Sequence, residues 1–362
     1  MYAYCIIFII LAMLAVEYEV KPIQRINFIL IIVFVFLILF TGLRDVSVSR
    51  DYEPYLGTFQ SVVKGHADEG LGFLPLYEPG FVWIVLICHK LFEPNAAAAV
   101  MLVFAALTII LKGFVVKRLS FNPFVVLLLY YSHYFFIQEM TQIRNGLACS
   151  FFFCALYFHL ENKTIKTVCC ILLAMLFHNS AILYFLLLLV RKDRLNGFFY
   201  VGLFLLSIIF GLLKVPLLSM MVGFDLNLIS NKLTTYVDIA NTQQEGSFRF
   251  FNVLNTINVL VTGYLLLYGI WYKVKDPGFI LFLKCNIIAL FTYGLLIDIP
   301  SVAHRFSELY GVVFPFLIAC GITFFPFKKF NIVLIIGIAA IFLYINLFYG
   351  KLLNPYSIIH FK

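Results

Sequence analysis

The sequence predicts an all-α polytopic membrane protein, and three observations support this fold class. Hydrophobic residues make up 63% of the 362 residues and charged residues only 12%, whereas a soluble globular domain carries about 25% charged residues. Apolar runs close to the length of a membrane-spanning helix, about 20 residues, recur from one end of the chain to the other. Lys and Arg gather in short clusters between many of these runs. We therefore expect one integral membrane domain that covers residues 1–362.

The apolar runs predict about 11–13 transmembrane or re-entrant helices. The first run lacks both a basic leader and a small-residue cleavage site, so we expect a retained helix rather than a cleaved signal. Two long polar and aromatic segments, 43–76 and 214–250, interrupt the pattern and are expected to be non-cytoplasmic loops. The runs cover roughly residues 2–16, 26–42, 77–91, 96–111, 122–137, 145–160, 165–190, 197–213, 251–271, 278–297, 308–325 and 330–349.

The net charge of +8 is expected to reflect basic loops held at the cytoplasmic face rather than nucleic-acid binding. Five basic clusters then lie in the cytoplasm: Lys112, Lys117 and Arg118; Lys163 and Lys166; Arg191, Lys192 and Arg194; Lys273 and Lys275; Lys328 and Lys329. This orientation places 138–144, 214–250 and 298–307 on the opposite side.

Two apolar runs fit this orientation only if they are not simple crossings. The run 165–190 must break into two short segments near His178 and Asn179, where polar backbone faces a wet cavity. If 43–76 lies outside, then 77–91 must be a re-entrant or surface-lying helix. The alternative, a cytoplasmic 43–76, is not excluded by charge.

A second set of ionisable residues lies at the expected non-cytoplasmic helix ends, where the positive-inside bias does not account for arginine. The planar fork of Arg suits phosphate better than Lys does, so arginines from four loops predict an anion pocket at the outer membrane surface. Structural roles are the alternative: Arg44 pairing with Asp45 or Asp51, Arg305 with Glu308, and Arg144 anchoring a helix at the headgroups. The set is Arg44, Asp45, Arg50, Asp51, Glu53, Glu78, Glu139, Arg144, His178, Arg249, Asp298, His304, Arg305 and Glu308.

Two residues of this set are candidate general bases toward a sugar hydroxyl. Asp51 directly follows a predicted spanning helix, and its structural alternative is to pair with Arg44 or Arg50. His178 lies inside an apolar run beside two small polar residues, and its structural alternative is a hydrogen-bonded buried histidine. The eight cysteines lie in or beside apolar runs and are expected to be small buried hydrophobes, with no metal site and no cofactor. Nucleotide-binding and metalloprotease motifs are absent from the sequence.

Five short elements, in order between about residues 40 and 310, resemble those of the EpsG family of Wzy-like surface-polysaccharide polymerases. The chain departs from the family pattern at residue 49, where Ser replaces the usual Gly before Arg50 and Asp51. The elements are GLR at 42–44 with SRDYEPY at 49–55, YEPGF at 77–81, RNGLA at 144–148, FHNSA at 177–181 and AHRF at 303–306.

The resemblance implies a GT-C-like architecture in the bacterial inner membrane and a metal-independent glycosyltransferase. The enzyme would transfer a glycan from undecaprenyl diphosphate onto the next lipid-linked repeat unit, with a Wzz-like chain-length regulator as a partner. Arg44, Arg144 and Arg305 would stabilise the leaving diphosphate, and Asp51 or His178 would accept the hydroxyl proton. The implied substrate-binding residues are Arg50, Tyr52, Tyr55, Tyr77, Glu78, Arg249 and His304.

Three other functions remain open from the sequence. A flippase or transporter of lipid-linked oligosaccharide would need charges deep in several helices, whereas the charges here lie toward one membrane face. An O-antigen ligase would share the Arg and His chemistry. A membrane acyltransferase would need a catalytic histidine, for which His178 and His304 are the candidates.

Overall fold

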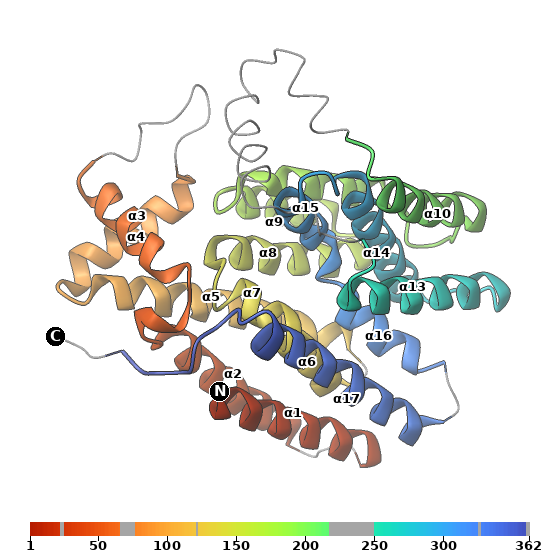
Figure 1. The fold of residues 1–362 in the computed structure, drawn as a ribbon, viewed down its shortest axis with the longest axis horizontal. Coiled ribbons are helices and arrows are strands. Elements are labelled where there is room, and N and C mark those ends of the chain that lie inside the picture. Colours follow the sequence, from red (N-terminus) through yellow and green to blue (C-terminus); the bar gives the residue numbers. More distant parts are fainter. Residues whose placement is uncertain (22–24, 66–76, 121, 217–249, 325–326, 360–362) are drawn as a thin grey trace. The chain divides into compact units, whose positions relative to one another are not determined.

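The computed structural model describes residues 1–21, 25–65, 77–120, 122–216, 250–324 and 327–359, and these residues form helices joined by short connections (Figure 1). Within these ranges the extended backbone forms only two isolated antiparallel bridges and no strand. The predicted all-α fold class is therefore confirmed.

Six helical stretches are long and apolar enough to cross a membrane. They are α1 (Tyr2–Val20), α5 (Ala96–Leu119), α8 (Ile143–Leu160), α13 (Val253–Trp271), α14 (Pro277–Leu295), and Phe330–Tyr349, which joins α17 (Lys328–Tyr344) to the π-helix η6 (Ile345–Tyr349). Helices α15 (Pro300–Gly311) and α16 (Phe314–Ile322), bent by 44° at their junction, would make a seventh span together. The chain is thus a multi-pass membrane protein, as predicted.

Six further apolar helices within the described ranges are shorter, 10–17 residues each. Together with the six spans and the bent pair they bring the apolar elements to thirteen, within the predicted range of transmembrane or re-entrant helices. They are α2 (Ile26–Gly42); Pro123–Gln138, which comprises α6 (Pro123–Tyr130), the π-helix η3 (Tyr131–Phe135) and α7 (Phe136–Gln138); α4 (Pro79–Phe92); α9 (Thr164–Met175); the 3-10 helix η4 (Asn179–Leu189); and α10 (Gly197–Leu213).

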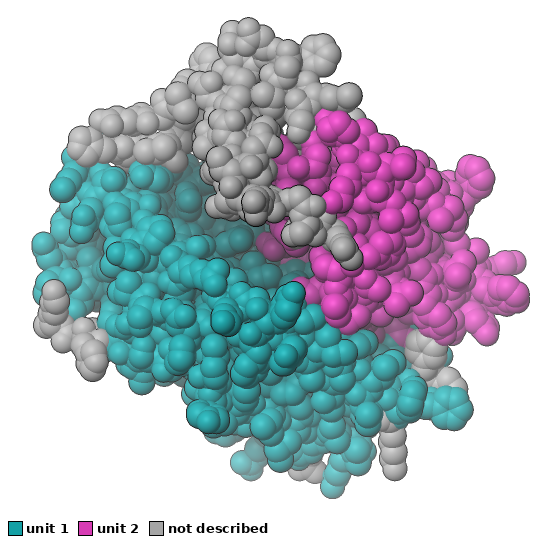
Figure 2. Space-filling model, in the orientation of Figure 1, with its two compact units in different colours: residues 1–185, 322–362 teal, residues 186–321 magenta. Residues whose placement is uncertain are grey.

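The chain divides into two compact units, coloured separately in Figure 2. Unit 1 comprises Met1–Phe185 and Ile322–Lys362, and unit 2 comprises Leu186–Gly321. In unit 1, α5 packs on α2, α4 and α8, and α8 packs on α9. In unit 2, α14 packs on α10, α13 and α15.

Polar side chains fasten α13 to α14 inside unit 2. The amide of Asn286 on α14 donates to Asn258 Oδ1 and Thr262 Oγ1 on α13, both at 2.7 Å. Apolar packing alone gives little preference for a neighbouring helix over lipid, so hydrogen bonds of this kind help to select the pairing.

Side-chain caps fix where several helices begin. Asn122, Asn196, Asn252 and Asp276 each accept a hydrogen bond from a backbone N–H in the first turn of α6, α10, α13 and α14. Proline follows the cap of α6 and of α14, where its missing N–H costs nothing.

The two apolar runs that did not fit simple crossings are both short elements in the structure. The predicted break in 165–190 is confirmed, because α9 ends at Met175 and η4 begins at Asn179. Helix α4 has 14 residues, or about 21 Å of length, against about 30 Å of bilayer core. This length agrees with a re-entrant or surface-lying helix.

The two polar segments are only partly described. The segment 43–76 contains a 3-10 turn, η1 (Val46–Val48), and an amphipathic helix, α3 (Tyr52–Val63). Residues 66–76 lie outside the described ranges, as do 217–249, which make up most of the predicted loop 214–250. The assignment of both segments to the non-cytoplasmic side stays a prediction.

The C-terminal segment 351–359 is held against residues 43–50, although more than 300 residues separate them in sequence. The backbone N–H groups of Asp45, Asn354 and Ile359 donate across the pair to Ser357, Val48 and Leu43. Tyr356 stacks on Phe40 at the end of α2, with ring centroids 4.1 Å apart, and its hydroxyl donates to the Phe40 carbonyl. The C-terminal segment therefore holds the turn that leads from α2 into α3.

Replacing this aromatic contact should loosen the turn. We expect Tyr356→Ala to lower stability by about 2 kcal/mol, because it removes a stacked pair and a hydrogen bond. Thermal unfolding of the detergent-solubilised protein, followed by size-exclusion chromatography after heating, would measure the change. Tyr349→Ala is the matched control, since Tyr349 is 80% exposed. Equal melting temperatures for the two variants would contradict this account.

Candidate active site

Three segments of unit 1 bring a carboxylate, a guanidinium and an imidazole together. Glu78 precedes α4, Arg144 lies in the first turn of α8, and His178 lies in the break between α9 and η4. Arg144 Nη1 lies 2.6 Å from Glu78 Oε2 and donates a hydrogen bond to it. His178 Nδ1 lies 3.6 Å from the other carboxylate oxygen, Oε1. All three residues belong to the set singled out in the sequence.

Backbone contacts fix Glu78 against the helix break. The Asn179 N–H, at the start of η4, points to Glu78 Oε1 at 3.4 Å, and the Gly80 N–H donates to the Leu176 carbonyl at 2.9 Å. A Cβ on Gly80 would lie 2.8 Å from that carbonyl oxygen and from the ring of Phe177. Glycine at this position therefore allows the close approach that brings Glu78 to His178.

The electrostatic balance keeps Glu78 ionised. Burial by itself raises the pKa of this carboxyl, but the adjacent His178 and the charge of Arg144 outweigh burial and lower the pKa to about 2. The carboxylate therefore stays negative throughout the physiological range and serves as a fixed counter-charge rather than as a proton donor.

Arg144 keeps capacity for a ligand while it is paired with Glu78. A guanidinium has five N–H donors, the ion pair uses one of them, and the side chain remains 29% exposed. Its charge also lies over the rings of Phe81 and Tyr55, at 5.3 Å and 5.9 Å from their centroids. Aromatic rings and one carboxylate thus orient the guanidinium without fully covering it.

One ring nitrogen of His178 faces the Glu78 carboxylate. Its Nδ1 is buried, faces Glu78 and forms no hydrogen bond among the described residues. The side chain as a whole is 28% exposed. A carboxylate behind one nitrogen of an imidazole restricts the orientation of the ring.

Aromatic side chains pack around Phe81, over which the guanidinium of Arg144 lies. Phe81, fully buried, lies about 6 Å from the rings of Tyr55, Phe59, Tyr77 and Phe104. Tyr55 and Tyr77, which were predicted to bind sugar, therefore lie beside Phe81. Tyrosine rings at such a position suit stacking on a sugar ring.

Arg44 is placed differently from the prediction. Its side chain is fully buried, donates to the Thr41 carbonyl at 2.5 Å, and lies 5.4 Å from the centroid of the Tyr52 ring. Among the described residues it has no ion pair, so the suggested pairing with Asp45 or Asp51 is not seen. Burial lowers the pKa of Arg44 to about 10, so the group remains cationic at neutral pH. Its position indicates that it braces the end of α2 against α3.

Asp51 and Arg50 lie next to this brace. Asp51 is the residue before α3, is half-buried, and has no hydrogen bond or ion pair to Glu78, Arg144 or His178 within the described part of the chain. Arg50 is exposed and donates to the carbonyl of Lys351 in the C-terminal segment at 2.9 Å. The general-base role of Asp51 and the ligand role of Arg50 stay predictions.

Three candidate residues belong to unit 2 or fall beyond the described ranges. His304 and Arg305 are exposed on α15 of unit 2, where the ring of His304 meets Tyr293 with centroids 5.2 Å apart. Arg249 lies outside the described residues. The roles predicted for these three stay predictions.

The structure revealed one buried network that the sequence analysis did not. Lys112, assigned there to a cytoplasmic basic cluster, is instead buried inside α5 and pairs with Glu139 at 2.6 Å. The hydroxyl of Tyr130 and the amide oxygen of Gln138 complete its contacts. The signal was present in the sequence, because Lys112 and Glu139 lie inside or beside apolar runs, where an ionisable residue needs a partner.

This network holds the turn that precedes Arg144. Glu139 follows α7 and Arg144 opens α8, so the turn 139–142 joins them. The Gln138 carbonyl lies so close to Gly146 that a Cβ there would be 2.8 Å from it, and Asn145 donates to Gln142 Oε1 at 3.2 Å. The Lys112–Glu139 ion pair therefore holds the start of the segment 139–142, and contacts with the first turn of α8 hold its end.

Comparison with known proteins gives one match. The model of the EpsG family matches residues 27–358, which is nearly the whole chain. No curated protein and no solved structure matches the chain. Among the described residues, no group of three or more His, Cys, Asp or Glu side chains is arranged to hold a metal ion.

The glycine contact behind Glu78 can be tested directly. We expect Gly80→Ala to destabilise the protein by about 1–3 kcal/mol, because the new Cβ would collide with the Leu176 carbonyl. Gly57→Ala is the matched control, since a Cβ at Gly57 meets nothing within 4 Å. Melting temperatures of the purified variants would distinguish them, and a fully stable Gly80→Ala protein would contradict the described docking.

The Lys112–Glu139 pair predicts a double-mutant cycle. Lys112→Met should cost about 3–5 kcal/mol because it leaves a buried carboxylate without a cation. The combined variant Lys112→Met/Glu139→Gln should be more stable than Lys112→Met alone, since the second change removes the unpaired charge. Additive losses in thermal stability would show that the two residues do not interact.

Proposed function

The chain belongs to the EpsG family, and from this premise we propose that it polymerises a lipid-linked surface polysaccharide in the bacterial inner membrane. Family membership makes it a membrane protein of polysaccharide biosynthesis. The observation that supports an enzyme is the cluster in which one carboxylate orients both a partly exposed arginine and a partly exposed histidine.

The proposed reaction is a glycosyl transfer between two lipid-linked sugars. The acceptor hydroxyl attacks the anomeric carbon of the donor glycan, a new glycosidic C–O bond forms, and the bond from that carbon to the lipid diphosphate breaks. The hydroxyl proton passes to a base, and the lipid diphosphate leaves with the electron pair of the broken bond. The products are a glycan one repeat unit longer on the acceptor lipid and free undecaprenyl diphosphate.

The three residues divide this chemistry between them. Arg144 stabilises the negative charge that grows on the diphosphate, since its free donors suit phosphate oxygens. His178 accepts the hydroxyl proton at Nε2, and Glu78 holds the ring and stabilises the imidazolium that forms. Tyr55 and Tyr77 contact sugar rings beside the cluster. Arg305, for the diphosphate, and His304, for substrate binding, belong to unit 2 and stay candidates on the sequence alone.

The sequence suggests Asp51 and His178 equally as the general base, and we favour His178. His178 has a carboxylate 3.6 Å from its Nδ1, whereas Asp51 has no hydrogen bond or ion pair to Arg144 within the described residues. Arg44 acts in this proposal as a positioning residue, because a fully buried guanidinium does not touch substrate. A chain-length regulator remains an expected partner on the grounds of the family resemblance alone.

Loss of Arg144 should stop chain growth without loss of the protein. We expect Arg144→Ala to lower polymerisation about 10²–10³-fold, the usual effect of removing a donor that stabilises developing charge. A gel of surface polysaccharide should then show a single repeat unit in place of a ladder. Arg118→Ala is the control, since Arg118 is an exposed arginine at the end of α5. A wild-type ladder from inserted Arg144→Ala protein would contradict the assignment.

Deletion of the gene separates the alternative functions in the same assay. A polymerase null leaves one repeat unit on the cell surface, and a flippase null leaves none. A ligase null leaves long polymer on the carrier lipid, with none transferred to its final acceptor.

A further inference from the structure

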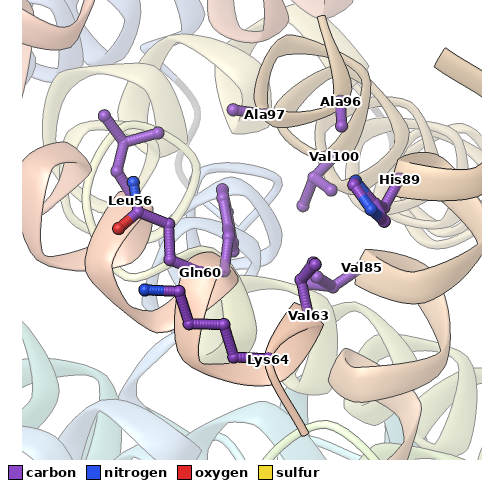
Figure 3. A pocket seen from close by; sticks show the side chains of 10 residues that line it. Leu56, Gln60, Val63, Lys64, Val85, His89, Ala96, Ala97 and Val100 are labelled. Atoms are coloured by element: carbon purple, nitrogen blue, oxygen red, sulfur yellow. The ribbon is translucent and has the colours of Figure 1, made fainter. Parts of the chain in front are cut away.

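An apolar groove lies on unit 1 between α3, the second half of α4 and the start of α5 (Figure 3). Its volume is about 270 Å³, and its apolar lining includes Leu56, Val63, Val85, Ala97 and Val100. Such a lining suits a hydrocarbon segment rather than a sugar, which needs hydrogen-bonding partners.

Cationic and polar groups lie at the edge of this groove. Gln60 and Lys64 reach it from the last turns of α3, and His89 reaches it from the last turns of α4 (Figure 3). Lys64 is exposed and has no acidic partner among the described residues. An unpaired ammonium beside an apolar groove is complementary to an anionic headgroup attached to a hydrocarbon chain.

The exposed face of α4 beside the groove is apolar. Trp83, Leu86, Ile87, Leu91 and Phe92 are each more than 40% exposed along this helix. Exposed apolar side chains on a helix of a membrane protein face lipid. A lipid tail could therefore reach the groove from the bilayer without crossing water.

The groove and the Arg144 cluster lie at different positions along the same helix. Glu78 immediately precedes α4, and His89 follows eleven residues later, which corresponds to about 16 Å along the helix axis. Two phosphate-binding sites at this separation could not serve the same diphosphate, but they could serve two lipid-linked molecules at once.

The proposed reaction needs two such molecules with different geometry. The donor diphosphate must lie at the bond that breaks, beside Arg144. The acceptor is attacked through its far, non-reducing sugar, so its own diphosphate must lie about one repeat unit away from the reaction centre. We propose that the groove between α3, α4 and α5 binds the acceptor, with its diphosphate at Lys64 and His89 and the first part of its polyprenyl chain in the groove. This inference rests on the proposed polymerase function.

The number of bound lipid diphosphates tests this proposal without catalysis. Purified protein in detergent is mixed with farnesyl diphosphate, a short polyprenyl diphosphate with no sugar, and bound copies are counted by native mass spectrometry. We expect two copies on the wild-type protein and one on Lys64→Glu, Ala97→Trp and Arg144→Ala. The combination Lys64→Glu/Arg144→Ala should bind none.

Matched variants keep the test specific. Lys90→Glu reverses an exposed charge on α4 that does not line the groove, and Leu91→Trp adds bulk on the exposed face, so both should retain two copies. If Ala97→Trp does not fold, Lys64→Glu, at an exposed position, still decides the question. Two copies on Lys64→Glu would overturn the proposal, as would displacement of the groove-bound copy by phosphatidylglycerol, which would mark an ordinary phospholipid site.

Failure of the polymerase function would be seen elsewhere. If deletion of the gene leaves the polysaccharide ladder intact, the proposed polymerase function is disproved, whatever number of bound lipid molecules is found. Conversely, a single-repeat phenotype on deletion, combined with only one copy bound to the wild-type protein, overturns the acceptor site alone.

Discussion

The junction of α4, α8 and the break between α9 and η4 depends on one buried carboxylate. Glu78 is 5% exposed, and a charge removed from water in this way is stable only if opposite charge and hydrogen bonds surround it. Arg144, the imidazole of His178 and the N–H of Asn179 meet that requirement. Since these partners come from α8 and from the break between α9 and η4, solvating one side chain brings three distant segments together.

The same requirement explains why the helix break can exist. A break in an apolar helix leaves backbone groups without partners, which is costly beside lipid. Here the Leu176 carbonyl accepts from the Gly80 N–H, and the Asn179 N–H points to Glu78. The break and the start of the short helix α4 therefore supply hydrogen-bonding partners for each other. The chemical groups of the candidate site lie at this junction because polar atoms are concentrated there.

The sequence predicted the parts that depend on local pattern. Apolar run length gave the helices, and the polar residues at 178–180 gave the break, because a hydrophobic run and its interruption can be read without knowing the fold. It also singled out Glu78, Arg144 and His178, since each is an ionisable residue where the orientation rule does not place one.

The sequence did not predict that Glu78 joins the other two, because pairing depends on which helices pack together. The partner of Lys112 was missed for the same reason: counting basic residues near a helix end does not reveal Glu139, which is 27 residues away in sequence and 2.6 Å away in space. The contact between the C-terminal segment and residues 43–50 was also unpredicted, because irregular extended backbone carries no periodic signal.

The short length of α4 links these observations to function. A helix of 14 residues cannot cross a bilayer, and its sequence is too apolar for a solvent-exposed position, so it must lie where protein, lipid and water meet. One end carries Glu78, which orients the cluster proposed to bind the leaving diphosphate. The other end borders an apolar groove beside Lys64, which has no acidic partner among the described residues. A full-length span would separate two such sites by the thickness of the membrane and place them on opposite faces. A helix about two thirds of that length keeps both within reach of one oligosaccharide, which is the geometry that the proposed joining of two lipid-linked glycans requires.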